Sequence, residues 1–223
     1  MQYIITALKS EAKPIIDYYG LKFSGLSNFP LYKNDNFTLL ITGVGRKNVS
    51  KVLNLFFQKN KVKKNYIINI GISGGKKADC SIGQLFLINK VSDEKSKLSF
   101  NLGSQHSFGL QNNEITTVSK PVVDNNFKGE GLVDMEAYEI CKTVNDLEVL
   151  NQLLIFKIVS DHMDMKHHIS ANQVQSLIKQ KVPVEYHQAC KSILLAAALT
   201  YVIGVFRSFF SLRFIWLLIT RMR

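Results

Sequence analysis

The stretch LLIFKIVSDHMD at residues 153–164 decides the fold class, because a strand-like apolar run ends there in a group of acidic side chains. A second acidic signature, Val133-Asp134-Met135-Glu136-Ala137, ends another such run, and Glu11 follows the strand-like residues 3–7. Proteins of the α/β class keep their ligands at the carboxyl ends of the strands. Three separate segments are therefore expected to bring one carboxylate each to a common edge of a sheet, which favours an enzyme.

Residues 1–190 alternate between short β-rich runs and helical patterns, which is typical of an α/β domain. One amphipathic helix is clear, because Val49, Val52, Leu53 and Phe56 recur at helical spacing. Its apolar stripe should pack on the sheet. The predicted strands are residues 3–7, 37–42, 66–71, 84–89, 115–118, 131–135 and 153–160.

The bulk composition argues for one domain in a reducing compartment. The chain has 223 residues, enough for a full core, and its 3 cysteines form no CxxC pair. No secretory signal is apparent, so we expect a cytoplasmic protein. The net charge of +11 does not indicate nucleic acid, because the lysines around residue 61 lack interleaved aromatic side chains and match no nucleic-acid motif.

Residues 191–223 form a hydrophobic, basic tail that differs from the rest of the chain. No acidic residue occurs in it, and residues 192–206 carry no charge at all. A helix that spans a bilayer needs about 20 apolar residues, so a span here would have to include Arg207 and Arg213. Three interpretations stay open: a core or interface helix, membrane contact through residues 192–220, or a non-native C-terminus.

Two glycine-rich turns accompany the acidic segments. Gly43-Val44-Gly45-Arg46 joins a predicted strand to the amphipathic helix, and Gly71-Ile72-Ser73-Gly74-Gly75 follows the predicted strand 66–71. Glycines let a backbone approach a ligand closely and direct N–H groups at its oxygens. Neither turn has the pattern of a Walker loop or of a dinucleotide fingerprint, and each alone is a weak signal.

With these five segments, in this order, the chain resembles the superfamily of purine nucleoside phosphorylases and methylthioadenosine/S-adenosylhomocysteine nucleosidases over about residues 1–185. The first of the segments is Ala7-Leu8-Lys9-Ser10-Glu11. The resemblance implies a single three-layer α/β/α domain with a mixed central sheet. It also implies cleavage of the N-glycosidic bond of a purine nucleoside through an oxocarbenium-like transition state.

The resemblance assigns a role to each acid. Asp161 would protonate the leaving purine at N7, for which its carboxyl must hold a proton near neutral pH, and Ser160 would orient it. Glu136 would accept hydrogen bonds from the ribose hydroxyls and stabilise the developing positive charge, with Met135 against the sugar. Glu11 would hold and activate the attacking water, which favours hydrolysis. The further substrate-binding residues are Ser73, Gly74 and Val133.

Several features leave alternatives to hydrolysis open. Arg46 and Gly45 could bind phosphate, as in phosphorylases, and a nucleoside-binding protein without activity is a further alternative. The segment between Gly75 and Val133 is shorter than in the familiar nucleosidases, and Lys9-Ser10 replaces an acidic pair, so the substrate is not determined.

We expect neither a metal nor a cofactor. His162, His167 and His168 lie near Asp161 and Asp164, but their spacing matches no known zinc pattern. The resemblance implies a small purine nucleoside as the ligand and a homo-oligomer as the assembly.

Overall fold

In a computed structural model of the chain, the residues that can be described are 2–24, 29–60, 62, 65–103, 109–123, 127–164 and 169–181. The helices are α1 (Lys9–Tyr19), α2 (Arg46–Lys59), α3 (Ala137–Asp146) and α4 (Ala171–Lys181), with a short 3-10 helix at Leu150–Gln152. The strands are β1 (Gln2–Thr6), β2 (Lys22–Phe23), β3 (Leu31–Lys33), β4 (Phe37–Ile41), β5 (Ile67–Gly74), β6 (Leu85–Asp93), β7 (Ser99–Asn101), β8 (Gln111–Thr117), β9 (Leu132–Asp134) and β10 (Leu153–Asp161).

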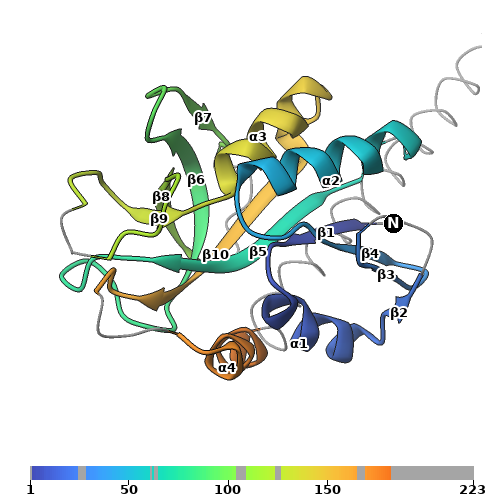
Figure 1. Cartoon of the computed structure of the whole chain (residues 1–223), viewed down its shortest axis with the longest axis horizontal. Coiled ribbons are helices and arrows are strands. Elements are labelled where there is room, and N and C mark those ends of the chain that lie inside the picture. The colour runs from blue at the N-terminus through green and yellow to red at the C-terminus, as the bar shows by residue number, and fades with distance from the viewer. Residues whose placement is uncertain are drawn as a thin grey trace, which may run out of the picture. The chain divides into compact units, whose positions relative to one another are not determined.

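The strands form one mixed sheet that lies between two helical layers (Figure 1). Helices α2 and α3 pack against each other on one face, and α1 and α4 pack against each other on the opposite face. Strands β1 and β4 are buried along their whole length, as expected for strands that are covered on both sides. The predicted α/β/α class is therefore confirmed.

The amphipathic stripe of α2 packs as its periodicity predicts. Val49, Val52, Leu53 and Phe56 are buried, and they join the large apolar core between the sheet and the layer of α2 and α3. Phe56 also makes an edge-to-face contact with Tyr3 of β1, with 5.3 Å between ring centroids. Apolar burial of this kind is the main term that fixes a helix on a sheet.

Five strands close into a ring at one side of the sheet. Strand β5 pairs with both β10 and β9, and the circuit continues from β10 through β6 and β8 back to β9. Within it, Gly74 of β5 lies beside Asp161 on one flank and beside Val133 on the other. The two acidic signatures therefore flank Gly74 on its two sides.

Strand β5 extends further than the sequence predicts. Residues 72–74 were expected in a turn, but they continue the strand because they pair with β10 as far as Gly74. Strands β2, β3 and β7 were not predicted, since each has only two or three residues and none of these residues is buried. Such short strands carry too few residues for a periodic signal.

The C-terminal tail lies outside the described residues, as do residues 104–108. The domain boundary near residue 190 therefore stays a prediction. Among the residues that the structure describes, no helix has the length and apolar character needed to cross a membrane.

Gly131, which leads into β9, is the glycine whose replacement should most disturb this arrangement. Its φ is +72°, and an added Cβ would collide with the backbone carbonyl of Glu114. Gly131→Ala should therefore lower the free energy of unfolding by about 2–4 kcal/mol, as the sum of a left-handed backbone and overpacking. Urea denaturation followed by circular dichroism measures this loss.

Gly20→Ala is the matched control, because Gly20 has a φ of +61° but open space around its Cβ position. That variant should lose only about 1 kcal/mol. Equal losses in the two variants would contradict the proposed collision at Gly131.

Candidate active site

A pocket of about 370 Å³ lies at the edge of the sheet where the acidic signatures meet. We call it the acid pocket, because the carboxylates of Glu11, Asp134, Glu136, Asp161 and Asp164 line it. Eight of the ten residues that the sequence singles out contribute to its wall, namely Glu11, Ser73, Gly74, Val133, Met135, Glu136, Ser160 and Asp161. The size suits a small organic ligand.

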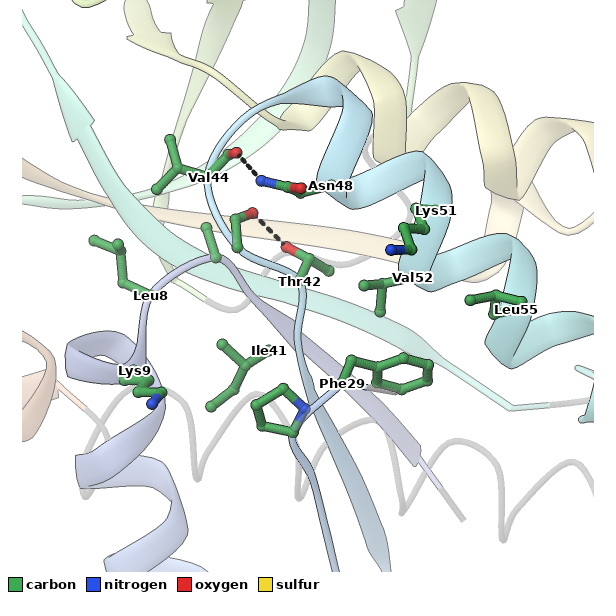
Figure 2. A pocket seen from close by; sticks show the side chains of 13 residues that line it. Leu8, Lys9, Phe29, Ile41, Thr42, Val44, Asn48, Lys51, Val52 and Leu55 are labelled. Atoms are coloured by element: carbon green, nitrogen blue, oxygen red, sulfur yellow. Dashed lines mark hydrogen bonds between the residues drawn. The ribbon is translucent and has the colours of Figure 1, made fainter. Parts of the chain in front are cut away.

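A second cavity of about 460 Å³ adjoins the acid pocket (Figure 2). We call it the side pocket. The two share Ala7, Leu8 and Val44 in their walls. Helix α2 and the end of β4 form most of the remaining wall of the side pocket.

Asp161 ends β10 and is held by short local hydrogen bonds. Its Oδ1 accepts from the backbone N–H of Met163 at 2.9 Å, and its Oδ2 lies 2.7 Å from Ser160 Oγ. Ser160 Oγ is also 3.1 Å from the carbonyl oxygen of Ser73. Ser160 thus links the end of β10 to Ser73 of β5 and holds the Asp161 carboxylate in place.

The loop after Asp161 is tightly wound. Met163 is 2% exposed and has a φ of +58°, which is uncommon for a residue with a side chain. The Asp161 side chain accepts from the N–H two residues on, an arrangement known as an Asx turn. Local backbone geometry therefore helps to fix the direction of the Asp161 carboxyl.

Glu11 occupies the first turn of α1 and is only 2% exposed. Its Oε2 accepts from the N–H groups of Ala7 and Leu8 at 2.9 and 2.8 Å, and its Oε1 accepts from Ile72 at 2.9 Å. A carboxylate offers about four acceptor positions, so one remains at Oε1. Burial raises the pKa of Glu11, although the N–H donors and Lys157 act in the opposite direction.

Glu136 precedes α3, and its carboxylate reaches across to the glycine turn before α2. Its Oε1 accepts from the N–H of Gly45 at 2.7 Å. Burial and the nearby Asp134 raise the pKa of Glu136 to about 7, although Lys157 lowers it. Glu136 is therefore partly protonated at neutral pH.

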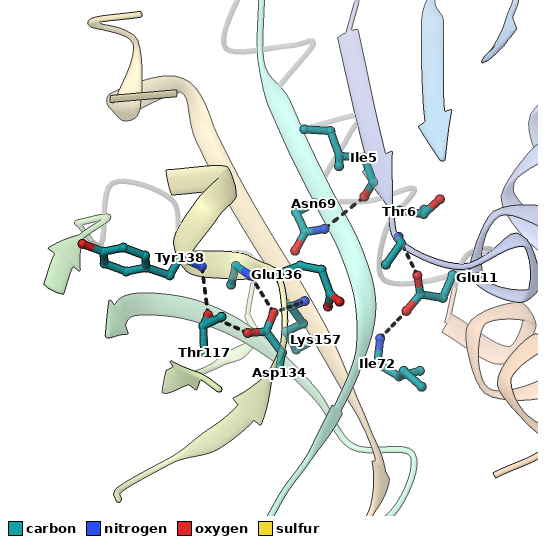
Figure 3. A network of polar contacts seen from close by, with 12 residues as sticks. Ile5, Thr6, Glu11, Asn69, Ile72, Thr117, Asp134, Glu136, Tyr138 and Lys157 are labelled. Carbon is teal, nitrogen blue, oxygen red and sulfur yellow. Dashed lines mark hydrogen bonds and ion pairs between the residues drawn. The ribbon is translucent and has the colours of Figure 1, made fainter. Parts of the chain in front are cut away.

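A buried ion pair joins these acids (Figure 3). Lys157 Nζ donates to Asp134 Oδ2 at 2.8 Å, and the side chains are 2% and 1% exposed. Burial alone would lower the pKa of Lys157, but the charges of Asp134, Glu136 and Glu11 outweigh burial and raise it. Lys157 is thus the buried cation that offsets part of the negative charge of the three acids.

Asp134 also organises the backbone around it. Its Oδ1 accepts from Thr117 Oγ1 at 2.7 Å, and its Oδ2 accepts from the N–H of Ala137 at 2.8 Å. Thr117 Oγ1 in turn accepts from the N–H of Tyr138 at 2.9 Å. These bonds satisfy N–H groups of the first turn of α3 and hold the helix beside β8 and β9.

Ser73 and Gly74 of β5 form the floor of the acid pocket between Asp161 and Glu11. Ser73 Oγ is buried, and no side chain or backbone group of the described residues pairs with it. An added Cβ at Gly74 would lie 2.8 Å from Met163 Cγ and 3.2 Å from Asp161 Oδ1. A side chain at position 74 would therefore crowd Met163 and Asp161, which explains the glycine there.

Arg46 and Gly45 lie away from the lining of the acid pocket. The Arg46 guanidinium forms an ion pair with Asp93, donates to the Thr117 carbonyl at 2.8 Å and lies over the Tyr138 ring. Burial pushes the pKa of Asp93 upward, but hydrogen bonds from Arg46 and Ser96 more than reverse this and hold it well below its usual range. The N–H of Gly45 is already donated to Glu136. Both residues thus have polar partners within the protein, although Arg46 Nε is buried without one in the described residues.

Sequence reasoning missed two features of the site. Lys157 was not singled out, although a lysine inside an otherwise apolar strand signals a buried partner of opposite charge. The apolar part of the pocket wall was missed too, because Val122 and Val123 come from an irregular segment that follows the predicted strand 115–118. No periodic pattern marks such a segment.

Within the described residues, no group of three or more His, Cys, Asp and Glu side chains is arranged to hold a metal ion. His162 instead places its Nδ1 3.1 Å from the carbonyl oxygen of Gly75. His167 and His168 lie outside the described residues.

No protein-family model matches the chain, and no curated protein matches it in sequence. Solved structures do resemble its fold. The 5′-methylthioadenosine/S-adenosylhomocysteine nucleosidase from Helicobacter pylori, in complex with butyl-thio-DADMe-Immucillin-A, has a TM-score of 0.67 and 16% identity, covering 87% of this chain and 98% of its own.

Two further structures are similar. An MTAN from Chlamydia trachomatis bound to MTA has a TM-score of 0.66 and 18% identity, covering 83% of this chain and 97% of its own. Futalosine hydrolase from Helicobacter pylori has a TM-score of 0.65 and 15% identity, covering 86% of this chain and 96% of its own. The chain therefore has the nucleoside phosphorylase-like fold that the sequence predicts.

Replacing Lys157 tests the buried charge network. Lys157→Met removes the cation and leaves buried carboxylates without it, so the free energy of unfolding at pH 7 should fall by about 3–5 kcal/mol. Lys90→Met is the matched control, because the Lys90–Glu114 ion pair is 38% and 40% exposed. It should leave the free energy of unfolding close to that of the parent, because an exposed ion pair contributes little. Urea denaturation of both variants and the parent measures the difference.

The loss in Lys157→Met should also grow with pH. Glu136 has a folded pKa of about 7 against an ordinary 4.5, so its contribution to stability is full below about pH 4.5 and is lost as the pH rises through 7. Without Lys157 the pKa of Glu136 rises further. The destabilisation of Lys157→Met relative to the parent should therefore be larger at pH 8 than at pH 5. A loss of equal size at pH 5 and pH 8 would contradict this coupling.

Proposed function

We propose that the protein is an N-glycosidase that hydrolyses an adenine-type purine nucleoside or thionucleoside. The observation that carries the proposal is the convergence of Asp161, Glu136 and Glu11 on one pocket. Their order along the sheet suits the base at Asp161, the sugar at Glu136 and a water molecule at Glu11. The nucleosidase fold of the chain supports the same reaction class.

Each acid has a separate task in the proposed reaction. As the C1′–N9 bond breaks, its electron pair goes to the purine, and Asp161 delivers a proton to N7. Glu136 accepts hydrogen bonds from the ribose hydroxyls through the oxygen that faces the pocket. A water molecule on the remaining acceptor position of Glu11 attacks C1′ and gives its proton to that carboxylate. The products are the free base and the sugar.

The charge of the acid pocket favours water over phosphate as the nucleophile. Among the described residues, its lining includes neither lysine nor arginine but five acidic residues, of which Asp134 is paired with Lys157. A phosphate dianion would be repelled there, whereas the cationic sugar of the transition state would be stabilised. Arg46, the basic residue near the glycine turn, is already paired with Asp93.

The apolar part of the pocket wall suits the purine ring. Val118 and Val133 pack with Met163 next to Asp161, and Val122 and Met135 extend this cluster. A planar base could lie on this wall with N7 toward Asp161. Ser73, which also lines the pocket, would lie beside the sugar.

The phosphate dependence of base release tests the reaction class. Purified protein should release adenine from methylthioadenosine or adenosine at the same rate with and without phosphate, and the sugar product should be free. Absorbance or chromatography follows the base. Strict dependence on phosphate with a sugar 1-phosphate product would establish phosphorolysis instead, and binding without base release would indicate a protein without activity.

Variants of the two proposed catalytic acids test their roles. Asp161→Asn and Glu11→Gln should each lower kcat by about a hundredfold or more, because each removes one proton-transfer group. Asp17→Asn is the control on α1, since its side chain is 58% exposed and pairs only with Lys13. That variant should keep the parent rate. Near-normal turnover of Asp161→Asn would refute its role as the acid.

A further inference from the structure

A lysine just beyond β5 reaches from the floor of the acid pocket to the segment that leads into β9. Lys76 follows Gly74, the last residue of β5, by two positions, and its side chain is half-buried, whereas that of Lys77 is exposed. Lys76 Nζ donates to the carbonyl oxygen of Gly129 at 2.8 Å, and it lies over the Phe127 ring, 6.0 Å from the centroid. One ammonium group thus contacts two residues of this segment.

These contacts attach residues 127–131 to the end of β5. Strand β9, which follows the segment, pairs with β5 through a single pair of residues, Gly74 and Val133. Among the described residues, Lys76 is the side chain that is hydrogen-bonded to residues 127–131. A hydrogen bond from a charged donor is stronger than one between neutral groups. Lys76 therefore adds a second attachment where the pairing of the strands is short.

Phe127 supports the apolar part of the wall of the acid pocket. It packs against the buried cluster of Val118, Val133 and Met163, and all three members of that cluster line the pocket. Phe127 is not itself among the lining residues. Its ring therefore forms a second layer behind the wall.

The backbone of Gly129 lies close against the Phe127 ring. An added Cβ at Gly129 would lie 2.2 Å from Phe127 Cζ, which is far inside contact distance. The ring face and the Gly129 carbonyl are thus close enough for one cation to contact both, and each contact has its own directional preference. Lys76 therefore constrains the ring and the turn together.

The residue before Lys76 holds the loop of the proposed general acid. The N–H of Gly75 donates to the carbonyl oxygen of Asp161 at 3.1 Å, and the Gly75 carbonyl oxygen lies 3.1 Å from His162 Nδ1. Two consecutive residues after β5 therefore contact both sides of the proposed base site, with the Asp161 loop on one side and the support of the apolar wall on the other.

We propose that Lys76 is a positioning residue for the purine base. It fixes Phe127, and Phe127 holds the apolar wall at a set distance from Asp161. The inference rests on the proposed function, in which this wall receives the base. Lys76 acts through Phe127 and contacts no reacting atom. Because the base meets the wall both before and during bond cleavage, a loss of Lys76 should weaken binding and leave the chemical step nearly unchanged.

Replacing Lys76 in the full chain tests the inference. With methylthioadenosine or adenosine, Lys76→Met should raise KM by about three- to tenfold at nearly constant kcat, because it removes one charge-assisted hydrogen bond and one cation–π contact. Lys76→Arg should restore most of the parent KM, since a guanidinium group also donates hydrogen bonds and stacks on rings. Lys77→Met is the matched control, and it should keep the parent values because Lys77 is exposed.

A double-mutant cycle tests whether Lys76 acts through Phe127. Phe127→Leu keeps an apolar side chain but removes the ring face, so it should also raise KM. The combination with Lys76→Met should raise KM by less than the product of the two single effects, because both changes remove the same contact. Urea denaturation verifies that each variant is folded, and Phe127→Leu reports on the contact if Lys76→Met does not fold.

The outcomes separate this inference from the proposed function. If the parent cleaves the nucleoside, the inference is overturned by an unchanged KM in Lys76→Met, by a fall in kcat alone, or by fully independent effects in the cycle, while the function stands. If the parent cleaves neither nucleoside, the function fails, and calorimetry with free adenine decides on Lys76. A Kd that is raised about three- to tenfold in Lys76→Met and restored in Lys76→Arg supports the inference. Equal affinities, or no binding by the parent, overturn it.

Discussion

The buried pairing of Lys157 with Asp134 is the interaction on which the site depends. Lys157 lies on β10, while Asp134 ends β9 and also binds Thr117 of β8 and the first turn of α3. Desolvating two charges is costly, and only close pairing with further hydrogen bonds offsets it. The pairing therefore ties three strands of the ring and one helix to a single arrangement, in which Glu136 and Glu11 face the same pocket.

This arrangement concentrates acidic side chains that are buried, namely Glu11, Asp134 and Glu136. Burial raises the pKa values of Glu11 and Glu136, and Lys157 limits the rise without entering the acid pocket. Carboxylates that hold protons more readily are suited to proton transfer, and their field favours a cationic sugar over an anionic nucleophile. The positive charge of Lys9 and Lys51 lies one strand further along the sheet, in the side pocket. The edge of the sheet is thus divided by charge, with an acidic section for the proposed chemistry and a basic section beside it.

Much of the fold follows from periodicity that the sequence carries. The apolar stripe of α2 and the seven predicted strands correspond to elements of the structure, because burial on a sheet leaves a regular pattern. Strands β2, β3 and β7 escape prediction because they are short and contain no buried residue. The extension of β5 through Ser73 escapes it because glycines normally end a strand, whereas here pairing with β10 keeps them in the sheet.

The sequence alone determined that carboxylates end the apolar runs at Asp134–Glu136 and at Asp161, and that glycines accompany them, because these are properties of consecutive residues. Only the tertiary structure decided which groups neutralise one another. Lys157 is 23 positions from Asp134, and Arg46 is 93 − 46 = 47 positions from Asp93, so no local pattern could pair them. The closure of five strands around Gly74 makes the first pairing. The second depends on the packing of α2 against α3, which in turn packs on β6 and β8. Long-range pairing of this kind converts a set of strand-end acids into one pocket with defined charge.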